Sequence, residues 1–273
     1  MRVFVTGAPG FIGSAVVQEL LQNGHQVLGL ARSDASADKV SKAGAEVHRG
    51  DLEDLESLKS GARDCDGVIH LAFLHDFANF MHCCEVDQAA IQAMGEAIEG
   101  TGKPLVIASG ILLLPQGKLC DEDTETNWEF PLAFRGKAET LVAQLSKEKN
   151  ILGSSVRLSP TVHGKGDKGF VPMLADFAKK NGFVTQVGDG RNHWTAVHRL
   201  DSARLFRLVL EKGKAGAVYH GVAEEGVEMR QILEAIAKHN NLKVETKSSE
   251  EAQQAIGFFA LATALDVIAS ILK

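Results

Sequence analysis

Three glycines at a fixed spacing follow the first short apolar run of this chain. The segment Thr6-Gly7-Ala8-Pro9-Gly10-Phe11-Ile12-Gly13 comes directly after residues 2–5 and opens a pattern of apolar residues three and four apart. A strand, a glycine turn and a helix in this order form a loop that can bind the pyrophosphate of a dinucleotide at the helix N-terminus. Gly7 permits the tight turn, Gly10 lets the backbone approach the anion, and Gly13 allows the helix to pack closely on the strand.

Short β-branched runs alternate with helical patterns over the first 158 residues. Helices are expected to begin at Ile12, at Ala89 and after Pro131, where apolar residues recur three and four apart. This alternation is typical of βαβ units on a parallel sheet, so we expect a doubly wound α/β fold of the Rossmann type, with residues 1–158 as the dinucleotide-binding domain. Strands are expected at residues 2–5, 26–30, 45–47, 67–71, 104–108 and 151–158.

The alternation stops after Leu158, and residues 159–273 are expected to form a smaller lobe that binds the substrate. No internal repeat or low-complexity linker separates the two parts. We therefore expect the lobe to pack on the first domain rather than to form a free domain. Its helices are expected at residues 170–180, 201–211 and 229–239, and a short strand at 217–221.

The composition is that of an ordinary globular protein and excludes several classes of function. Hydrophobic residues make up 45% of the 273 residues and charged residues 23%, which excludes a disordered chain, a collagen and a coiled-coil rod. The net charge is -6 and no basic block appears, so no nucleic-acid partner is expected. The longest apolar stretch, residues 258–272, contains Asp266 and is shorter than the ~20 residues that span a bilayer. No membrane partner is therefore expected.

The four cysteines, Cys65, Cys83, Cys84 and Cys120, lack the paired C-x-x-C spacing of a zinc site. We expect no metal and four reduced thiols, as is usual in a cytoplasmic protein. The expected partner is a small-molecule substrate, and the sequence leaves open whether the chain is a monomer or a homodimer.

The end of the second expected strand indicates which dinucleotide the loop prefers. In Leu30-Ala31-Arg32-Ser33 an arginine stands about 20 residues after the glycines, where a site for NAD(H) usually has Asp or Glu on the ribose 2′-hydroxyl. A carboxylate repels a 2′-phosphate, whereas a guanidinium can pair with it. Arg32 therefore favours NADP(H) over NAD(H); the alternative is a solvated surface arginine.

Further segments resemble, in the same order, the extended and atypical short-chain dehydrogenase/reductase superfamily, which includes NAD-dependent epimerases and dehydratases. These segments are Gly50-Asp51-Leu52, His70-Leu71-Ala72, Ala108-Ser109-Gly110, residues 156–164, and the paired runs 187–190 and 197–201. The resemblance implies an Asp near the adenine, a catalytic serine and a loop beside the nicotinamide. We therefore expect cofactor-binding residues in the glycine loop, at Arg32 and in or directly after these segments: Thr6, Gly7, Gly10, Phe11, Ile12, Gly13, Arg32, Asp51, Leu52, Leu71, Ala72, Phe73, Ser109, Pro160, Thr161, Val162 and His163.

The chain departs from this superfamily at the usual catalytic motif. Most members carry Tyr-x-x-x-Lys on the helix after the serine, but residues 130–139 contain no tyrosine. One register puts Pro131 at the tyrosine and Arg135 at the lysine, and we prefer it because an atypical subgroup has His-x-x-x-Arg there. The other register puts Ala133 and Lys137 in these places. We therefore expect the atypical subgroup, with a replacement for the tyrosine acid.

Reduction of a carbonyl needs a hydride, which nicotinamide supplies, and a proton. Ser109 can hydrogen-bond the carbonyl oxygen, and Arg135 can stabilise an oxyanion but stays protonated near neutral pH. Lys137 can donate a proton if it is desolvated, and His75 is a further candidate acid at the carboxyl edge of the sheet. For each of these catalytic candidates, a structural or solvated role is the alternative. The residues expected to contact the substrate are Asp76, His193 and Trp194.

Three functions stay open from the sequence. The first is an NADP(H)-dependent oxidoreductase that acts on a small carbonyl or alcohol substrate. The second is a dinucleotide-binding sensor that has lost catalysis, which the missing tyrosine favours, and the third is an epimerase or dehydratase. The single tyrosine, Tyr219, is expected on a strand of the smaller lobe, in a packing role.

Overall fold

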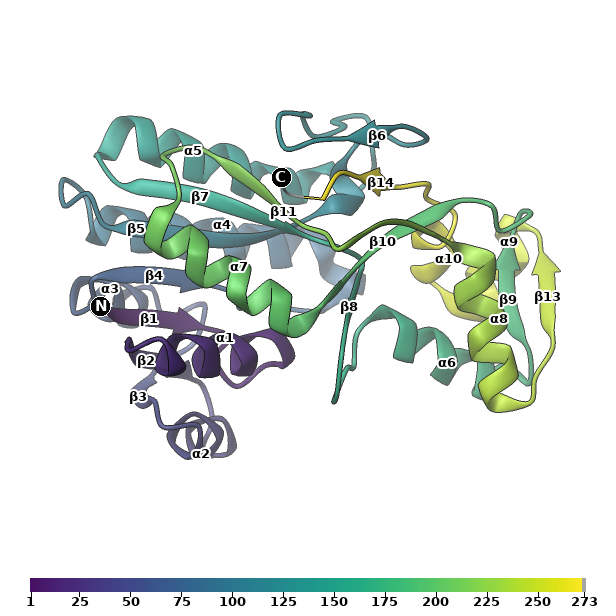
Figure 1. The fold of residues 1–273 in the computed structure, drawn as a ribbon, viewed down its shortest axis with the longest axis horizontal. Coiled ribbons are helices and arrows are strands. Elements are labelled where there is room, and N and C mark those ends of the chain that lie inside the picture. The colour runs from purple at the N-terminus through teal and green to yellow at the C-terminus, as the bar shows by residue number, and fades with distance from the viewer. Residues whose placement is uncertain (272–273) are drawn as a thin grey trace. The chain divides into compact units, whose positions relative to one another are not determined.

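A seven-stranded sheet forms the centre of the first of two compact units in this computed structural model, which describes residues 1–271 (Figure 1). The strands are β1 (Arg2–Thr6), β2 (Gln26–Ala31), β3 (Glu46–Arg49), β4 (Gly67–His70), β5 (Pro104–Gly110), β7 (Leu152–Leu158) and β11 (Val218–Gly221). Their order is β11-β7-β5-β4-β1-β2-β3, and β1 pairs in parallel with both β2 and β4. The winding therefore reverses between β1 and β4, the position where open α/β sheets bind ligands.

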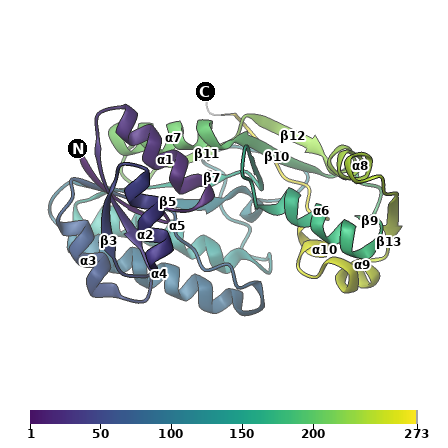
Figure 2. The same cartoon turned by 90° about the horizontal axis from the view of Figure 1, so that it is seen from below.

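Helices cover both faces of this sheet. They are α1 (Phe11–Gln22), α2 (Asp34–Lys42), α3 (Leu55–Arg63), α4 (Phe80–Ala97), α5 (Lys137–Lys149) and α7 (Arg199–Lys212), with short 3-10 turns η1 (Phe77–Asn79) and η3 (Ala133–Gly136). Figure 2 shows α1 and α7 together on one face, and α3 and α4 on the other. The sequence predicts α1, which has Asn23 as its C-cap, but not α2 and α3. The side chains of Ser33 and Asp54 cap these two helices by accepting from backbone N–H groups.

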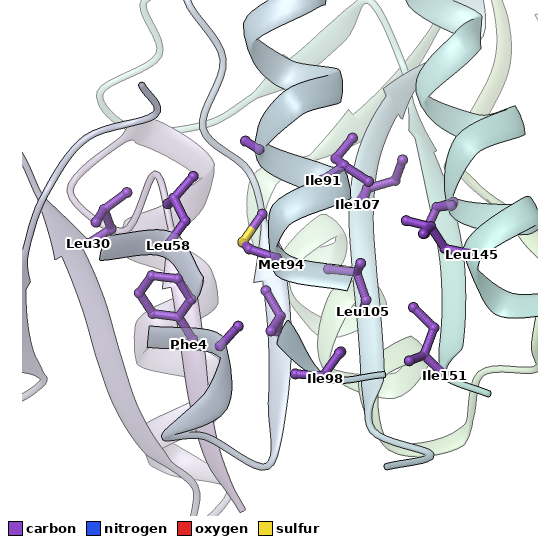
Figure 3. Close-up of a cluster of buried hydrophobic side chains, with 14 of the residues drawn as sticks. Phe4, Leu30, Leu58, Ile91, Met94, Ile98, Leu105, Ile107, Leu145 and Ile151 are labelled. Atoms are coloured by element: carbon purple, nitrogen blue, oxygen red, sulfur yellow. The ribbon is translucent and has the colours of Figure 1, made fainter. Parts of the chain in front are cut away.

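Aliphatic and aromatic side chains fill the core between the sheet and the layer of α3, α4 and α5 (Figure 3). Phe4 of β1 lies beside Leu58 of α3 and Leu30 of β2, and Met94 of α4 continues the cluster. None of these four side chains is more than 6% exposed. Because both faces of the sheet are covered, β1 is a continuous apolar run rather than an alternating one.

The second unit comprises Gly110–Asn127, Leu158–His198 and the chain from His220 onward. Its strands pair in three small sheets, β12-β10-β8, β13-β9 and β14-β6, and its core gathers around the fully buried Trp194. Every helix within residues 1–271 is too short or too polar to cross a membrane. The elements are η2 (Ile111–Leu113), β6 (Leu119–Cys120), β8 (Thr161–His163), α6 (Phe170–Asn181), β9 (Val184–Val187), β10 (His193–His198), β12 (Glu224–Glu228), α8 (Met229–Asn240), β13 (Val244–Lys247), α9 (Ser249–Ile256), α10 (Phe259–Ala262) and β14 (Ile268–Ala269).

The two units interleave along the chain, so a boundary after residue 158 describes only part of the arrangement. The segment Arg199–Tyr219, expected in the smaller lobe, belongs to the first unit. There α7 packs on α1, and Arg207 donates to Glu19 Oε1 at 2.7 Å. The expectation that Tyr219 lies in the smaller lobe is therefore wrong, because β11 forms an edge of the seven-stranded sheet. The Tyr219 hydroxyl accepts a hydrogen bond from the backbone N–H of Lys214 at 3.0 Å.

Leu58→Ala tests whether the core drawn in Figure 3 carries the stability of the first unit. Leu58 is fully buried, so its truncation removes apolar contacts and leaves a cavity, which costs about 2–5 kcal/mol of unfolding free energy. The control is Leu152→Ala, because Leu152 is 42% exposed and surface substitutions change stability by about 0.5 kcal/mol or less. Urea titration followed by circular dichroism measures both. Equal losses in the two variants would contradict the packing described here.

Candidate active site

The glycine loop joins β1 to α1 in a backbone conformation that only glycine accommodates. Gly7 has φ +69, and a Cβ on it would lie 2.8 Å from the backbone nitrogen of Ala72. A Cβ on Gly13 would collide with the carbonyl oxygen of Gly7. Gly10 stands at the N-cap of α1, where no side chain caps the helix and the first turn holds no acidic residue. The first N–H groups of α1 therefore stay open to an anion.

Ser109 stands next to the carboxyl end of β5, two strands from β1 in the sheet. The residue is 8% exposed, and its Oγ has no hydrogen-bond partner among residues 1–271. A buried hydroxyl without a partner is costly, so such a group in a folded protein needs an explanation. A bound ligand that hydrogen-bonds the Ser109 oxygen provides one.

A chain of buried side-chain hydrogen bonds runs beneath these strand ends. Thr6 Oγ1, at the end of β1, lies 2.7 Å from His70 Nδ1 at the end of β4. His70 Nε2 lies 3.2 Å from Oδ1 of Asp87 on α4, and both of these side chains are 1% exposed. Thr6 Oγ1 also accepts the backbone N–H groups of Leu71 and Ala72, each at 3.2 Å. The chain therefore joins the strand before the glycine loop to the turn after β4.

Arg135 of η3 extends this chain to the strand that carries Ser109. Its Nη1 donates to Asp87 Oδ2 at 2.8 Å, and its Nη2 donates to the carbonyl oxygen of Ala108 at 2.7 Å. The guanidinium carbon also lies 4.8 Å from the centre of the Phe73 ring. Two of the five guanidinium N–H groups are thus engaged, and the charge is balanced by a buried carboxylate. Arg135 holds the backbone next to Ser109 and keeps donors for a ligand.

His75 and Asp76 follow β4 on the surface of the first unit. The His75 ring packs edge-on against Phe73 with ring centres 5.6 Å apart. Desolvation lowers the pKa of His75 from its ordinary 6.5, and the charge of Arg135 lowers it further. Asp76 caps η1 by accepting from the Ala78 N–H at 3.1 Å. A hydrogen bond from the Asn79 side chain is the main cause that lowers the Asp76 pKa.

Two other predicted site residues of the first unit are exposed. Lys137 begins α5, and its Nζ lies 4.1 Å from the centre of the Phe134 ring. The condition for Lys137 as an acid was desolvation, which an exposed side chain does not meet. Arg32 follows β2 and makes no ion pair with any described residue. Its neighbour Asp34 is paired with Arg49 at 2.5 Å instead.

The remaining predicted cofactor residues of the first unit divide between the turns and the core. Asp51 Oδ1 accepts the backbone N–H groups of Glu53 and Asp54 at 2.9 and 3.0 Å, which fixes the turn before α3. Leu52 is only 7% exposed and lies in the hydrophobic core, so its side chain packs rather than faces a ligand. Phe73 is half-buried under Arg135.

The predicted site residues after position 158 lie in the second unit. Pro160, Thr161, Val162 and His163 lead into and form β8, which pairs in parallel with β10. The His163 ring lies 5.4 Å from that of His198, edge to face. Their role beside the nicotinamide stays a prediction.

The two residues of this unit that were expected to contact the substrate, His193 and Trp194, differ in how far their side chains are exposed. His193 Nδ1 donates to Asp266 Oδ1 at 2.9 Å, and the side chain is 30% exposed. Trp194 is fully buried, and its indole N–H donates to the carbonyl oxygen of Ala262 at 3.2 Å. The structure therefore gives Trp194 a packing role and leaves it no open face for a substrate.

The four cysteines are buried free thiols. Burial raises the pKa of Cys65 and of Cys84 to about 11. The thiolate is the reactive form of cysteine, so these two groups are unreactive near neutral pH.

Asp87 is the member of this site that the sequence analysis missed. It stands on α4 between Val86 and Gln88, ahead of the helix start expected at Ala89, because α4 begins at Phe80. Its partners His70 and Arg135 are 17 and 48 residues away along the chain. The only available signal was the place of His70 near the end of the strand expected at residues 67–71, because an imidazole that is buried there needs a partner.

Comparison with known proteins assigns the family. The model of the NAD dependent epimerase/dehydratase family matches residues 3–222. An uncharacterized protein of Saccharomyces cerevisiae is 48% identical over 260 residues, which cover 94% of this chain and 87% of the relative. A Stigmatella aurantiaca enzyme, named 4-hydroxy-2-methyl-3-oxo-4-farnesyl-3,4-dihydroquinoline-1-oxide ketoreductase, is 29% identical over 255 residues, which cover 90% of this chain and 75% of the relative.

Solved structures share the fold. UDP-glucose 4-epimerase of Thermus thermophilus, in complex with NAD, superposes with a TM-score of 0.77 at 24% identity, covering all of this chain and 90% of the other. A dTDP-glucose 4,6-dehydratase of Streptomyces venezuelae, with NAD and TYD bound, gives a TM-score of 0.76 at 20% identity and covers 94% of this chain and 91% of the other. With its Rossmann-type parallel sheet and a family match over residues 3–222, the chain belongs to the NAD-dependent epimerase/dehydratase family.

Proposed function

We propose that this chain is an oxidoreductase that transfers a hydride between NADP(H) and a small carbonyl or alcohol substrate, in the atypical subgroup that lacks Tyr-x-x-x-Lys. The observation that carries the proposal is the Ser109 hydroxyl, which is buried at the end of β5 and has no partner among the described residues. A carbonyl oxygen is a ligand atom that this hydroxyl can donate to. The names of two relatives agree: one is a ketoreductase, and a Dictyostelium discoideum protein 25% identical to this chain is a sterol-4-alpha-carboxylate 3-dehydrogenase.

The residues around the glycine loop fit a dinucleotide. Gly10 leaves the N-terminus of α1 without a side chain, and the first turn has no acid that would repel a pyrophosphate. Arg32 is exposed and unpaired among the described residues, so its guanidinium is available to a 2′-phosphate. Both structural neighbours described above carry NAD, which favours NAD(H) for those proteins. Arg32 is the feature of this chain that favours NADP(H).

The side chains of the first unit divide the work of carbonyl reduction between them. The bound dinucleotide supplies the hydride to the carbonyl carbon. Ser109 donates to the carbonyl oxygen, where negative charge develops. Arg135 holds the Ala108 carbonyl and thereby the strand end beneath that oxygen. His75 gives the oxygen its proton, or accepts the proton when the alcohol is oxidised.

A second function, a dinucleotide sensor without turnover, is favoured by one observation. The chain has a single tyrosine, and the hydroxyl of Tyr219 on β11 is engaged with the backbone of Lys214. The usual acid of the superfamily is therefore missing, and the sensor needs none. Turnover of any carbonyl substrate separates the two functions.

Arg32→Asp tests the cofactor preference. The substitution replaces a cation that pairs with the 2′-phosphate by a carboxylate that repels it, so the Kd for NADPH rises far more than the Kd for NADH. A hydrogen bond to a charged group contributes about 1.5–3 kcal/mol. Fluorescence titration measures both affinities. Arg63→Asp makes the same charge change at an exposed position on α3 and leaves the preference unchanged. Equal weakening of NADPH and NADH in Arg32→Asp removes the proposed role of this residue.

Ser109→Ala tests the oxyanion contact. Loss of one such donor lowers kcat by about 10²–10³-fold, while the dinucleotide affinity changes little because the glycine loop is untouched. Single-turnover NADPH oxidation with a panel of carbonyl compounds measures the effect. The matched control is Tyr219→Phe, which removes a hydroxyl of the same unit whose one partner among residues 1–271 is the Lys214 N–H, and we expect turnover to be retained. If Tyr219→Phe abolishes turnover and Ser109→Ala does not, the active site lies elsewhere.

The pH dependence tests His75. Its pKa lies below the ordinary 6.5 because of desolvation and the Arg135 charge. The protonated fraction therefore grows only as the pH falls through that lowered value. If His75 is the acid, the rate of carbonyl reduction rises as the pH falls, with its inflection below 6.5, and the rate of alcohol oxidation rises with pH through the same value. Both inflections vanish in His75→Gln. An unchanged pH profile in this variant shows that another group transfers the proton.

A further inference from the structure

The carboxylate of Asp87 is buried in the first unit, and the proposed reaction does not use it. Each oxygen has one partner: Oδ1 bonds His70 Nε2 at 3.2 Å, and Oδ2 accepts from Arg135 Nη1 at 2.8 Å. We propose that Asp87 is a positioning residue that couples the dinucleotide loop to the strand end that carries Ser109. The coupling to Ser109 rests on the proposed function. The coupling to the loop rests on the family alone.

The first arm of this coupling runs through the tautomer of His70. Thr6 Oγ1 accepts two N–H groups, from Leu71 and Ala72, and a hydroxyl oxygen has two lone pairs. Its own hydrogen is thus left to donate to His70 Nδ1, 2.7 Å away. His70 therefore carries its hydrogen on Nε2 and donates it to Asp87, because a carboxylate only accepts. Asp87 fixes the tautomer, and the tautomer fixes the direction of the Thr6 hydroxyl.

Thr6 transmits this orientation to the glycine loop. It directly precedes Gly7, whose own Cα has no room for a side chain beside the Ala72 backbone nitrogen. The same Ala72 nitrogen donates to Thr6 Oγ1. One hydroxyl thus holds the turn after β4 against the loop that we expect to bind the pyrophosphate.

The second arm runs through Arg135. The guanidinium needs a buried counter-charge because its side chain is only 15% exposed, and Asp87 supplies it. In that position its Nη2 donates to the Ala108 carbonyl, one residue before Ser109. Asp87 thereby acts on the serine strand without touching it.

Asp87→Asn breaks the first arm in a defined way. The new side chain has one acceptor oxygen where the carboxylate has two, and the charged guanidinium of Arg135 is the stronger donor. The amide oxygen turns to Arg135, and the amide NH₂ then faces His70 Nε2. The His70 hydrogen has to move to Nδ1, where it meets a Thr6 oxygen whose lone pairs are already used. One of the two backbone bonds to Thr6 is lost, and we expect dinucleotide affinity to fall about 5- to 150-fold, the usual range of coupling between sites.

A second substitution in the same chain distinguishes this mechanism from general damage. In Asp87→Asn with Arg135→Gln, the competing cation is gone, so the amide oxygen accepts from His70 and the amide NH₂ donates to the new glutamine oxygen. His70 returns to its Nε2–H tautomer, and the dinucleotide affinity recovers although two buried charges are missing.

The experiment has two readouts on the full chain. Imidazole ¹⁵N NMR reports the tautomer, with the His70 signals identified among ten histidines by their loss in His70→Gln. Titration with NADPH and NADH reports the affinity, and circular dichroism confirms folding. We expect the Nε2–H tautomer in the wild type and the double variant, the Nδ1–H tautomer in Asp87→Asn, and affinities that follow the tautomer.

The proposal is overturned if Asp87→Asn keeps the wild-type tautomer, if its tautomer changes while the affinity does not, or if the folded double variant recovers neither. Should Asp87→Asn fail to fold, Thr6→Val tests the same arm, because it replaces the hydroxyl by a methyl group of similar size. This variant must weaken dinucleotide binding, and an affinity equal to that of the wild type overturns the coupling. A wild type that binds neither dinucleotide overturns the proposed function, and the NMR comparison then decides alone whether Asp87 sets the His70 tautomer.

Discussion

The hydrogen-bond chain from Thr6 through His70 and Asp87 to Arg135 is the interaction on which the site depends. It ties together the carboxyl ends of β1, β4 and β5, which come from distant parts of the sequence and meet where the winding of the sheet reverses. Hydrophobic packing brings these strands together but does not fix their ends to the precision of a binding site. A fully satisfied buried polar network does, because every member has one acceptable orientation. The glycine loop and the Ser109 strand are therefore placed by the same four side chains.

This arrangement changes what Arg135 can contribute. A free guanidinium beside a developing oxyanion stabilises it through its full charge, but the charge of Arg135 is balanced by Asp87 at 2.8 Å. Its main contribution is then geometric, through the Ala108 carbonyl. The first unit holds a second buried pair: Arg157 of β7 donates to both oxygens of Glu139 on α5. Buried ion pairs add little net stability over apolar contacts. We therefore expect these two pairs to matter mainly because they orient the side chains that they join.

The spacing of apolar residues along the sequence predicted the strands and helices whose buried faces follow that spacing. The strand, glycine turn and helix at residues 2–22, and the helices at 170–181 and 229–240, follow the expected periodicity closely. The short helices α2 and α3 begin at polar caps and were missed, although their buried residues recur at helical spacing: Ala37 and Val40 on α2, and Leu58 and Ala62 on α3. β12 reads Glu-Glu-Gly-Val-Glu and is mostly exposed, which hides a strand from any search for apolar alternation. α7 and Tyr219 belong to the first unit because they pack on segments far away along the chain, which the local sequence pattern does not reveal.

The candidate site divides in the same way. Gly7 and Gly13 were predicted because the backbone turn needs glycine at fixed places in the sequence, and Ser109 because residues 108–110 resemble the serine segment of the superfamily. Asp87 was not, because nothing in the helix around it distinguishes an acid that faces solvent from one that faces a buried imidazole. That distinction depends on His70 and on an arginine 48 residues away. The structure shows both partners at Asp87, as a buried carboxylate needs hydrogen bonds to offset the loss of water. The buried Asp87 carboxylate, which contacts both His70 and Arg135, is therefore more informative about how this site is built than the absence of the usual tyrosine.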